Sequence, residues 1–106
     1  MEQIIYEKLQ TVARAHELTN YTEVGALVSL GPHDVRLWAM LDEINRFEHE
    51  HKRPMISAVV IAKEENRPGS GFWVCASDLG EFIMGGDEDR FWNDELRRVW
   101  EYWTSH

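Results

Sequence analysis

The first half of the chain repeats its apolar residues at the spacing of amphipathic helices. This pattern predicts a helix over residues 2–18, a short second helix ending at Leu30, and a third helix from Pro32 to Glu48. Pro32 suits the first turn of a helix because its missing N–H would have no partner there. The apolar side of the third helix consists of Leu37, Trp38, Leu41, Ile44 and Phe47.

The pattern changes after residue 50. Residues 55–62 form a continuous apolar run rich in β-branched side chains, which predicts a buried strand. Residues 63–71 are charged and then rich in glycine and proline, as expected of an exposed hairpin or wing loop. Residues 72–79 fit either a short helix or a returning strand. We favour the helix, because Gly80 suits the position just after a helix C-terminus.

A long C-terminal helix is predicted to start at Asp87-Glu88-Asp89, which supplies a cap and the negative charge that a helix N-terminus prefers. Its apolar face contains Trp92, Leu96, Val99 and Trp103. The sequence therefore predicts one domain over residues 1–106, of the α+β class and mostly helical. Three helices, a short strand or hairpin with a wing loop, and a C-terminal helix make the expected layout winged-helix-like.

Composition places the chain among folded domains. Hydrophobic residues make up 43% of the sequence and include five tryptophans, unlike the composition of a disordered segment. The apolar run Ala58–Ala62 is far shorter than the roughly 20 residues of a transmembrane helix. The single cysteine, Cys75, has apolar neighbours, and nothing at the N-terminus resembles a signal peptide. We therefore expect an inert thiol, no membrane contact and a cytoplasmic location.

Charge is unevenly distributed along the chain. The formal net charge of −8 disfavours nonspecific binding to nucleic acid. Residues 78–106 hold eight acidic and three basic residues, so they carry −5 of that total. The cluster Asp87-Glu88-Asp89 is explained by helix capping or, alternatively, by a surface that engages a cationic partner.

Tryptophans and arginines supply further candidate contact residues. Trp38, Trp92 and Trp103 fit core stripes, whereas Trp73 and Trp100 are predicted to lie at the edge of the domain as anchors for a partner. Arg67 in the loop and Arg53 just before the apolar run favour a local contact with an acidic partner. The interaction candidates are Arg53, Arg67, Trp73, Asp87, Glu88, Asp89 and Trp100.

The densest group of possible metal ligands is Glu48-His49-Glu50-His51. Imidazole and carboxylate donors suit zinc. On a helix, however, His49 and His51 point about 200° apart, and they converge only if the segment is extended. They are therefore weak candidates, and no other motif indicates a metal, a cofactor or a catalytic residue.

Three short motifs resemble a group of small bacterial and phage-borne proteins of uncharacterised function. They are Arg53-Pro54, Ser57-Ala58-Val59-Val60 and Pro68-Gly69-Ser70-Gly71-Phe72. The resemblance covers residues 20–103. It implies a stand-alone domain and no particular activity.

The order of elements also resembles the winged-helix half of DNA alkyltransferases. Tyr21-Thr22-Glu23-Val24 opens a helix as the Tyr-Gly-Glu-Val of that family does. Where the family has Pro-Cys-His-Arg, this chain has Pro54-Met55-Ile56-Ser57, without the alkyl-accepting cysteine and its histidine. Only the layout is therefore carried over.

These observations leave four functional hypotheses. We favour a non-enzymatic module, of bacterial or phage origin, that binds another protein. The first alternative is an acidic inhibitor that mimics DNA and occupies a nucleic-acid-binding protein. The second is a DNA-binding regulator whose basic face would consist of Arg36, Arg46, Arg53 and Arg67. The third is a small metal-dependent hydrolase around His49 and His51.

Overall fold

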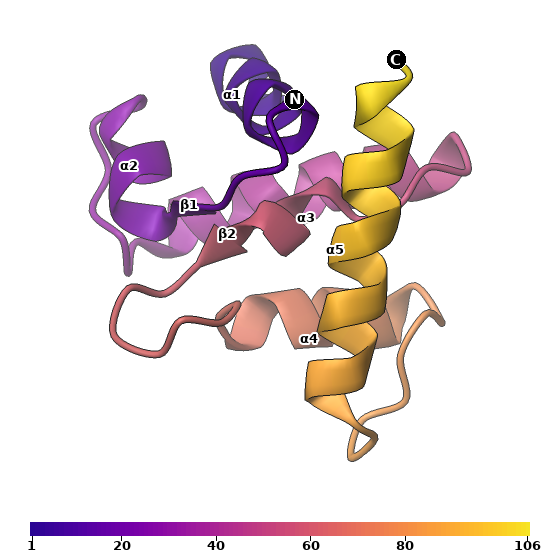
Figure 1. The fold of residues 1–106 in the computed structure, drawn as a ribbon. Coiled ribbons are helices and arrows are strands. Elements are labelled where there is room, and N and C mark those ends of the chain that lie inside the picture. Colours follow the sequence, from indigo (N-terminus) through magenta and orange to yellow (C-terminus); the bar gives the residue numbers. More distant parts are fainter.

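Most of the chain is helical in the computed structural model, which describes all of residues 1–106 (Figure 1). In chain order the elements are α1 (Gln3–Arg14), β1 (Thr19–Asn20), α2 (Tyr21–Ala26), α3 (Val35–Glu50), the 3-10 helix η1 (Ile56–Val59), β2 (Val60–Ile61), α4 (Ser70–Asp78) and α5 (Glu88–Thr104). The predicted α+β class with mostly helical content is therefore confirmed. None of these helices has the length and apolar character needed to cross a bilayer.

Side-chain caps start three of the helices. Asn20 accepts a hydrogen bond from the Glu23 N–H at the start of α2, and Asp87 accepts one from the Arg90 N–H at the start of α5. Asp34 caps α3, so this helix begins at Val35 and not at Pro32, as the sequence predicted. The predicted start of the C-terminal helix is confirmed.

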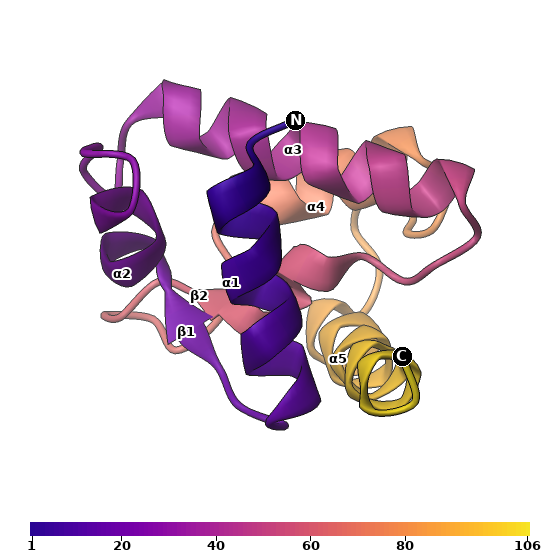
Figure 2. The same ribbon diagram turned by 90° about the horizontal axis from the view of Figure 1, so that it is seen from above.

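The apolar run 55–62 is not the strand that the sequence predicted. It forms η1 and then β2, which pairs in parallel with β1 over two residues, Thr19 with Val60 and Asn20 with Ile61. No longer strand lies beside the run, so its first half forms local hydrogen bonds such as the one from the Ala58 N–H to the Met55 carbonyl. The run is apolar because α1, α3 and α5 all pack on η1 (Figure 2).

The winged-helix layout is not confirmed. A wing is an antiparallel hairpin, whereas the only ladder here is parallel. The charged loop after β2 is closed by a single antiparallel bridge between Ala62 and Arg67, and the chain then enters α4. The predicted helix over residues 72–79 is confirmed as α4, with Gly80 behind it at a φ of +76°.

The Glu48 side chain joins α1 to the end of α3 and pairs with the partly buried Arg53. The fully buried carboxylate of Glu48 accepts hydrogen bonds through Oε1 from the Tyr6 hydroxyl and from the Arg53 guanidinium, the latter at 2.9 Å. Burial, and then the bond to Glu48, raises the pKa of Tyr6 to about 12. Arg53 also lies over the Phe47 ring. Arg53, predicted as a contact residue for a partner, therefore binds residues of its own chain.

We expect Arg53→Ala to lower the free energy of unfolding by about 3 kcal/mol, because it leaves the buried Glu48 carboxylate without its cation. The double variant Arg53→Ala/Glu48→Gln recovers part of that loss, since its buried amide carries no charge. Urea unfolding of both variants and of Glu48→Gln alone measures this coupling. Strictly additive effects would contradict it.

We expect the thiol of Cys75 to be inert in the folded protein. Cys75 is buried in α4, and this burial, followed by its contact with Asp42, raises the pKa of the thiol to about 12. A chromogenic disulfide reagent should therefore react at pH 8 only as fast as the chain unfolds, and at full rate in urea. Rapid reaction without denaturant would show that the thiol is accessible.

Candidate functional site

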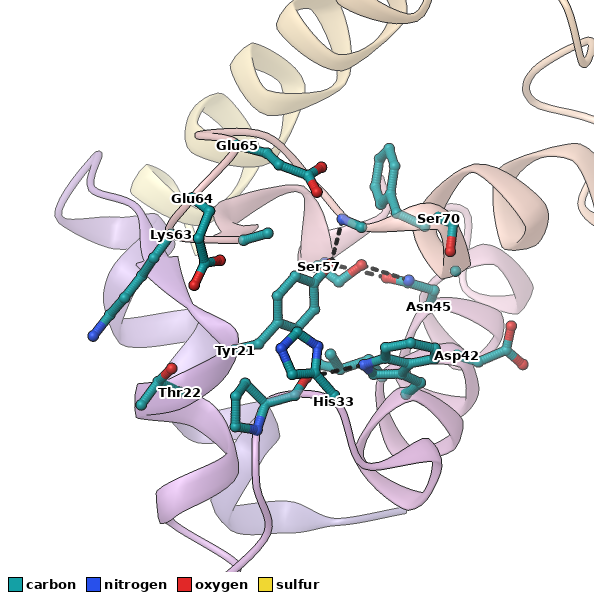
Figure 3. Close-up of a pocket in the computed structure, with 17 residues that line it drawn as sticks. Tyr21, Thr22, His33, Asp42, Asn45, Ser57, Lys63, Glu64, Glu65 and Ser70 are labelled. Atoms are coloured by element: carbon teal, nitrogen blue, oxygen red, sulfur yellow. Dashed lines mark hydrogen bonds between the residues drawn. The ribbon is translucent and has the colours of Figure 1, made fainter.

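A pocket lies where the start of α2, the middle of α3 and the start of α4 meet (Figure 3). The loop after β2 contributes residues 62–65 to its mouth. Its volume is about 290 Å³, at the lower end of the ~300–1,000 Å³ typical of ligand pockets. Six separate segments of the chain supply its lining, so the pocket exists only in the folded domain.

Aromatic rings form much of the pocket wall. The Trp38 indole N–H donates to the Pro32 carbonyl at 3.2 Å, which holds a ring that is 38% exposed. The Tyr21 hydroxyl accepts from the Gly69 N–H at 2.8 Å and so ties α2 to the start of α4. A Cβ on Gly69 would lie only 3.3 Å from that hydroxyl, so this close approach favours glycine. Phe72 and Leu41 complete the apolar wall.

Two buried polar residues contribute to the inner lining of the pocket. Asn45 is 2% exposed and Ser57 is 5% exposed. The Asn45 amide donates to Ser57 Oγ at 2.6 Å, and its oxygen accepts from the Ser57 N–H at 3.2 Å. These bonds leave the Ser57 hydroxyl hydrogen and one Asn45 amide hydrogen without an acceptor in the protein. The inner polar groups therefore offer hydrogen-bond donors.

The mouth of the pocket is acidic. In Figure 3 the carboxylates of Glu64 and Glu65 lie on the pocket side of their loop, whereas the Lys63 side chain extends away. Asp42 also lines the pocket, but Arg46 binds its carboxylate at 2.6 Å. Burial alone would raise the pKa of Asp42, yet the bonds from Arg46 and Cys75 hold it below its usual value. Asp42 is thus ionised but neutralised locally.

The arginines of the predicted basic face are all bound by carboxylates. The predicted loop contact Arg67 pairs with Glu88 at 2.7 Å and Asp89 at 3.3 Å, and its guanidinium lies over the buried Trp73 ring. The other pairs are Arg36 with Asp34, Arg46 with Asp42 and Asp78, and Arg53 with Glu48. The structure therefore presents no cluster of uncompensated arginines at these positions.

The acidic C-terminal part is also used mostly within the chain. Of the eight acidic residues in 78–106, seven cap a helix or contact a basic side chain; Glu101 is the exception. Asp87 caps α5, while Glu88 and Asp89 bind Arg67. These contacts give the predicted acidic cluster a structural role.

Two tryptophan predictions are wrong. Trp73 was predicted at the edge, but it is only 5% exposed and packs against Phe82 and Phe91. Trp38 was predicted in the core, but it lines the pocket and is 38% exposed. Trp100 is partly buried and stacks on His16 with ring centroids 5.5 Å apart.

The two candidate metal ligands are not brought together. His49 Nδ1 lies 3.3 Å from a Glu81 carboxylate oxygen, whereas His51 Nδ1 lies 2.8 Å from the Phe47 carbonyl oxygen. Each ring therefore has a different partner. No group of three or more His, Cys, Asp or Glu side chains is arranged to hold a metal ion.

The pocket itself was missed at the level of sequence. Its inner polar lining comes from Asn45, within an apolar helix stripe, and from Ser57, within an apolar run. A polar residue inside a buried stripe needs a hydrogen-bond partner, and this need was the signal in the sequence that could have pointed to Asn45 and Ser57. Two of the motifs behind the resemblance, at residues 57–60 and 68–72, both contribute lining residues.

Glu95 gives the acidic helix a pH-dependent effect on stability. It is buried, accepts from the Met55 N–H at 2.8 Å and binds Arg98 at 2.7 Å. Burial, the largest cause, raises its pKa above the ordinary 4.5, although the bonds from Met55 and Arg98 oppose it. The folded state thus holds this proton more tightly, and the stabilisation from this group is lost as the pH rises above about 4.5.

We expect Glu95→Gln to be more stable than the wild type at pH 7 and equally stable below pH 4, because glutamine keeps an acceptor for Met55 without a buried charge. Urea unfolding between pH 3.5 and 8 measures the difference. If the variant instead became less stable than the wild type as the pH rises, the buried charge of Glu95 would be stabilising and this account would be wrong.

Comparisons of the chain with protein-family models, with curated proteins and with solved structures find no match.

Proposed function

We propose that this chain is a non-enzymatic protein-binding module whose pocket between α2, α3 and α4 receives one side chain of a partner. The observation that carries the proposal is the pocket itself, with aromatic walls at Tyr21 and Trp38 and hydrogen-bond donors at Asn45 and Ser57. Protein interfaces are anchored by single side chains that fill desolvated pockets of this kind.

The size of the pocket supports a side chain as its occupant. At about 290 Å³ it lies at the lower end of the range for ligand pockets, where a single side chain fits better than a large cofactor. Trp38 and Tyr21 are partly exposed aromatic residues at its wall, and such residues are enriched where proteins bind one another.

The chemistry of the pocket supports binding and not turnover. A nucleophilic serine needs a general base, whereas the partner of Ser57 is the amide of Asn45, which does not accept a proton. The pairing of the arginines weighs against a DNA-binding regulator, and the pairing of the acidic C-terminal residues weighs against a DNA mimic. A cytoplasmic location fits the single buried thiol.

Selection from a random nine-residue peptide display library tests the pocket. Gly71 lines it, and a Cβ built there meets no atom within 4 Å, so Gly71→Trp should fill the mouth without disturbing the fold. We expect peptides selected on the wild type to lose at least tenfold in affinity for Gly71→Trp.

Val74→Trp is the matched control. Val74 lies on the same helix, is 51% exposed and does not line the pocket, so this change adds the same ring elsewhere. Both variants should match the wild type in circular dichroism and thermal unfolding. If no selected peptide distinguishes Gly71→Trp from Val74→Trp, the pocket is not a protein-binding site.

A further inference from the structure

We infer that the segment bound by the pocket is basic: an uncharged side chain enters the pocket, and a lysine or arginine beside it in the partner pairs with Glu64 and Glu65. This inference rests on the proposed function and adds the chemistry of the partner. The contact uses two consecutive carboxylates at the mouth of an aromatic pocket, both exposed to solvent.

Neither carboxylate has an ion-pair partner in the folded chain. Ten of the nineteen acidic residues lie within 4.0 Å of a basic group, and Glu64 and Glu65 are not among them. The two nearest cations in sequence do not compensate them. Arg67 is bound to Glu88 and Asp89, and Lys63 extends away from the pocket (Figure 3). Their negative charge is therefore available to a partner.

The loop that carries these carboxylates is a closed turn. The N–H of Ala62 donates to the Arg67 carbonyl at 2.9 Å, and the N–H groups of Glu65 and Asn66 donate back to the Ala62 carbonyl. Asn66 adopts a left-handed φ of 54°, which asparagine tolerates better than most residues. Because the turn is already ordered, pairing with a cation costs little backbone entropy.

The interior of the pocket determines where the cation lies. Asn45 and Ser57 are uncharged, and the nearby Asp42 carboxylate is already bound by Arg46, so a lysine or arginine head group inside would lose its hydration without gaining a free carboxylate. A cationic head group is therefore favoured at the mouth, beside Glu64 and Glu65, and an uncharged side chain inside. A phosphate backbone would instead meet these two carboxylates and be repelled, which favours a protein segment over nucleic acid.

The charge of the selected peptides tests this inference directly. Among peptides that distinguish Gly71→Trp from Val74→Trp, we expect lysine and arginine to be enriched over the input library. In fluorescence polarisation at low salt, Glu64→Gln/Glu65→Gln should weaken their binding by about 2- to 30-fold, the effect of two exposed ion pairs. In 0.5 M NaCl this difference should shrink, because salt screens exposed charges.

The double variant Glu50→Gln/Glu101→Gln is the matched control. Both residues are exposed, lie outside the pocket and have no ion-pair partner, so the net charge changes by the same amount. The inference is wrong if this control weakens binding equally, or if pocket-dependent peptides are neutral or acidic and insensitive to Glu64→Gln/Glu65→Gln. That result would leave the pocket as a binding site, whereas an absence of pocket-dependent peptides would refute the proposed function as well.

Discussion

The backbone of residues 55–61 crosses the middle of the molecule, and the arrangement of the helices depends on how its polar groups are satisfied there. Only the last two residues of this segment have a strand beside them, so the rest depends on local hydrogen bonds and on side chains of the helices. Glu95 accepts from the N–H of its first residue, Asn45 accepts from an N–H near its middle, and the Trp92 indole donates to one of its carbonyls. These bonds fix α3 and α5 around one buried segment.

The same requirement creates the pocket. Asn45 is present in the buried stripe of α3 because the crossing segment has an N–H to satisfy, and its amide then reaches Ser57 Oγ. Once those two bonds are made, the donors left over line the pocket. Binding groups held in this way sit on rigid elements, since moving them would break the contacts of the core. Fold and candidate site therefore share one hydrogen-bonding pair.

The helices could be predicted because their signals are local. Asp87 caps the start of α5, and Gly80 follows the end of α4, so each signal lies within a few residues of the helix end that it marks. The apolar run was wrongly predicted to be a strand throughout, because a segment surrounded by helices and a central strand have the same composition. The burial of individual tryptophans was equally ambiguous. Trp38 is exposed and Trp73 is buried, the reverse of the prediction, because burial depends on which other elements pack on a helix. The pocket is built from six segments, so no contiguous motif marks it in the sequence.

Net charge describes this chain poorly, because most of its arginines are bound by its own carboxylates. Most of those pairs are local in sequence, but Arg46 with Asp78 and Arg67 with Glu88 join segments that are distant in sequence. Each pair reduces the electrostatic potential around it. At physiological salt, screening limits the effect of an exposed charge to about 8 Å. A partner therefore responds to the carboxylates that the fold leaves unpaired near it, and not to the total of −8. At the pocket those are Glu64 and Glu65, so the binding proposed there depends on the loop after β2 and not on the acidic C-terminal helix.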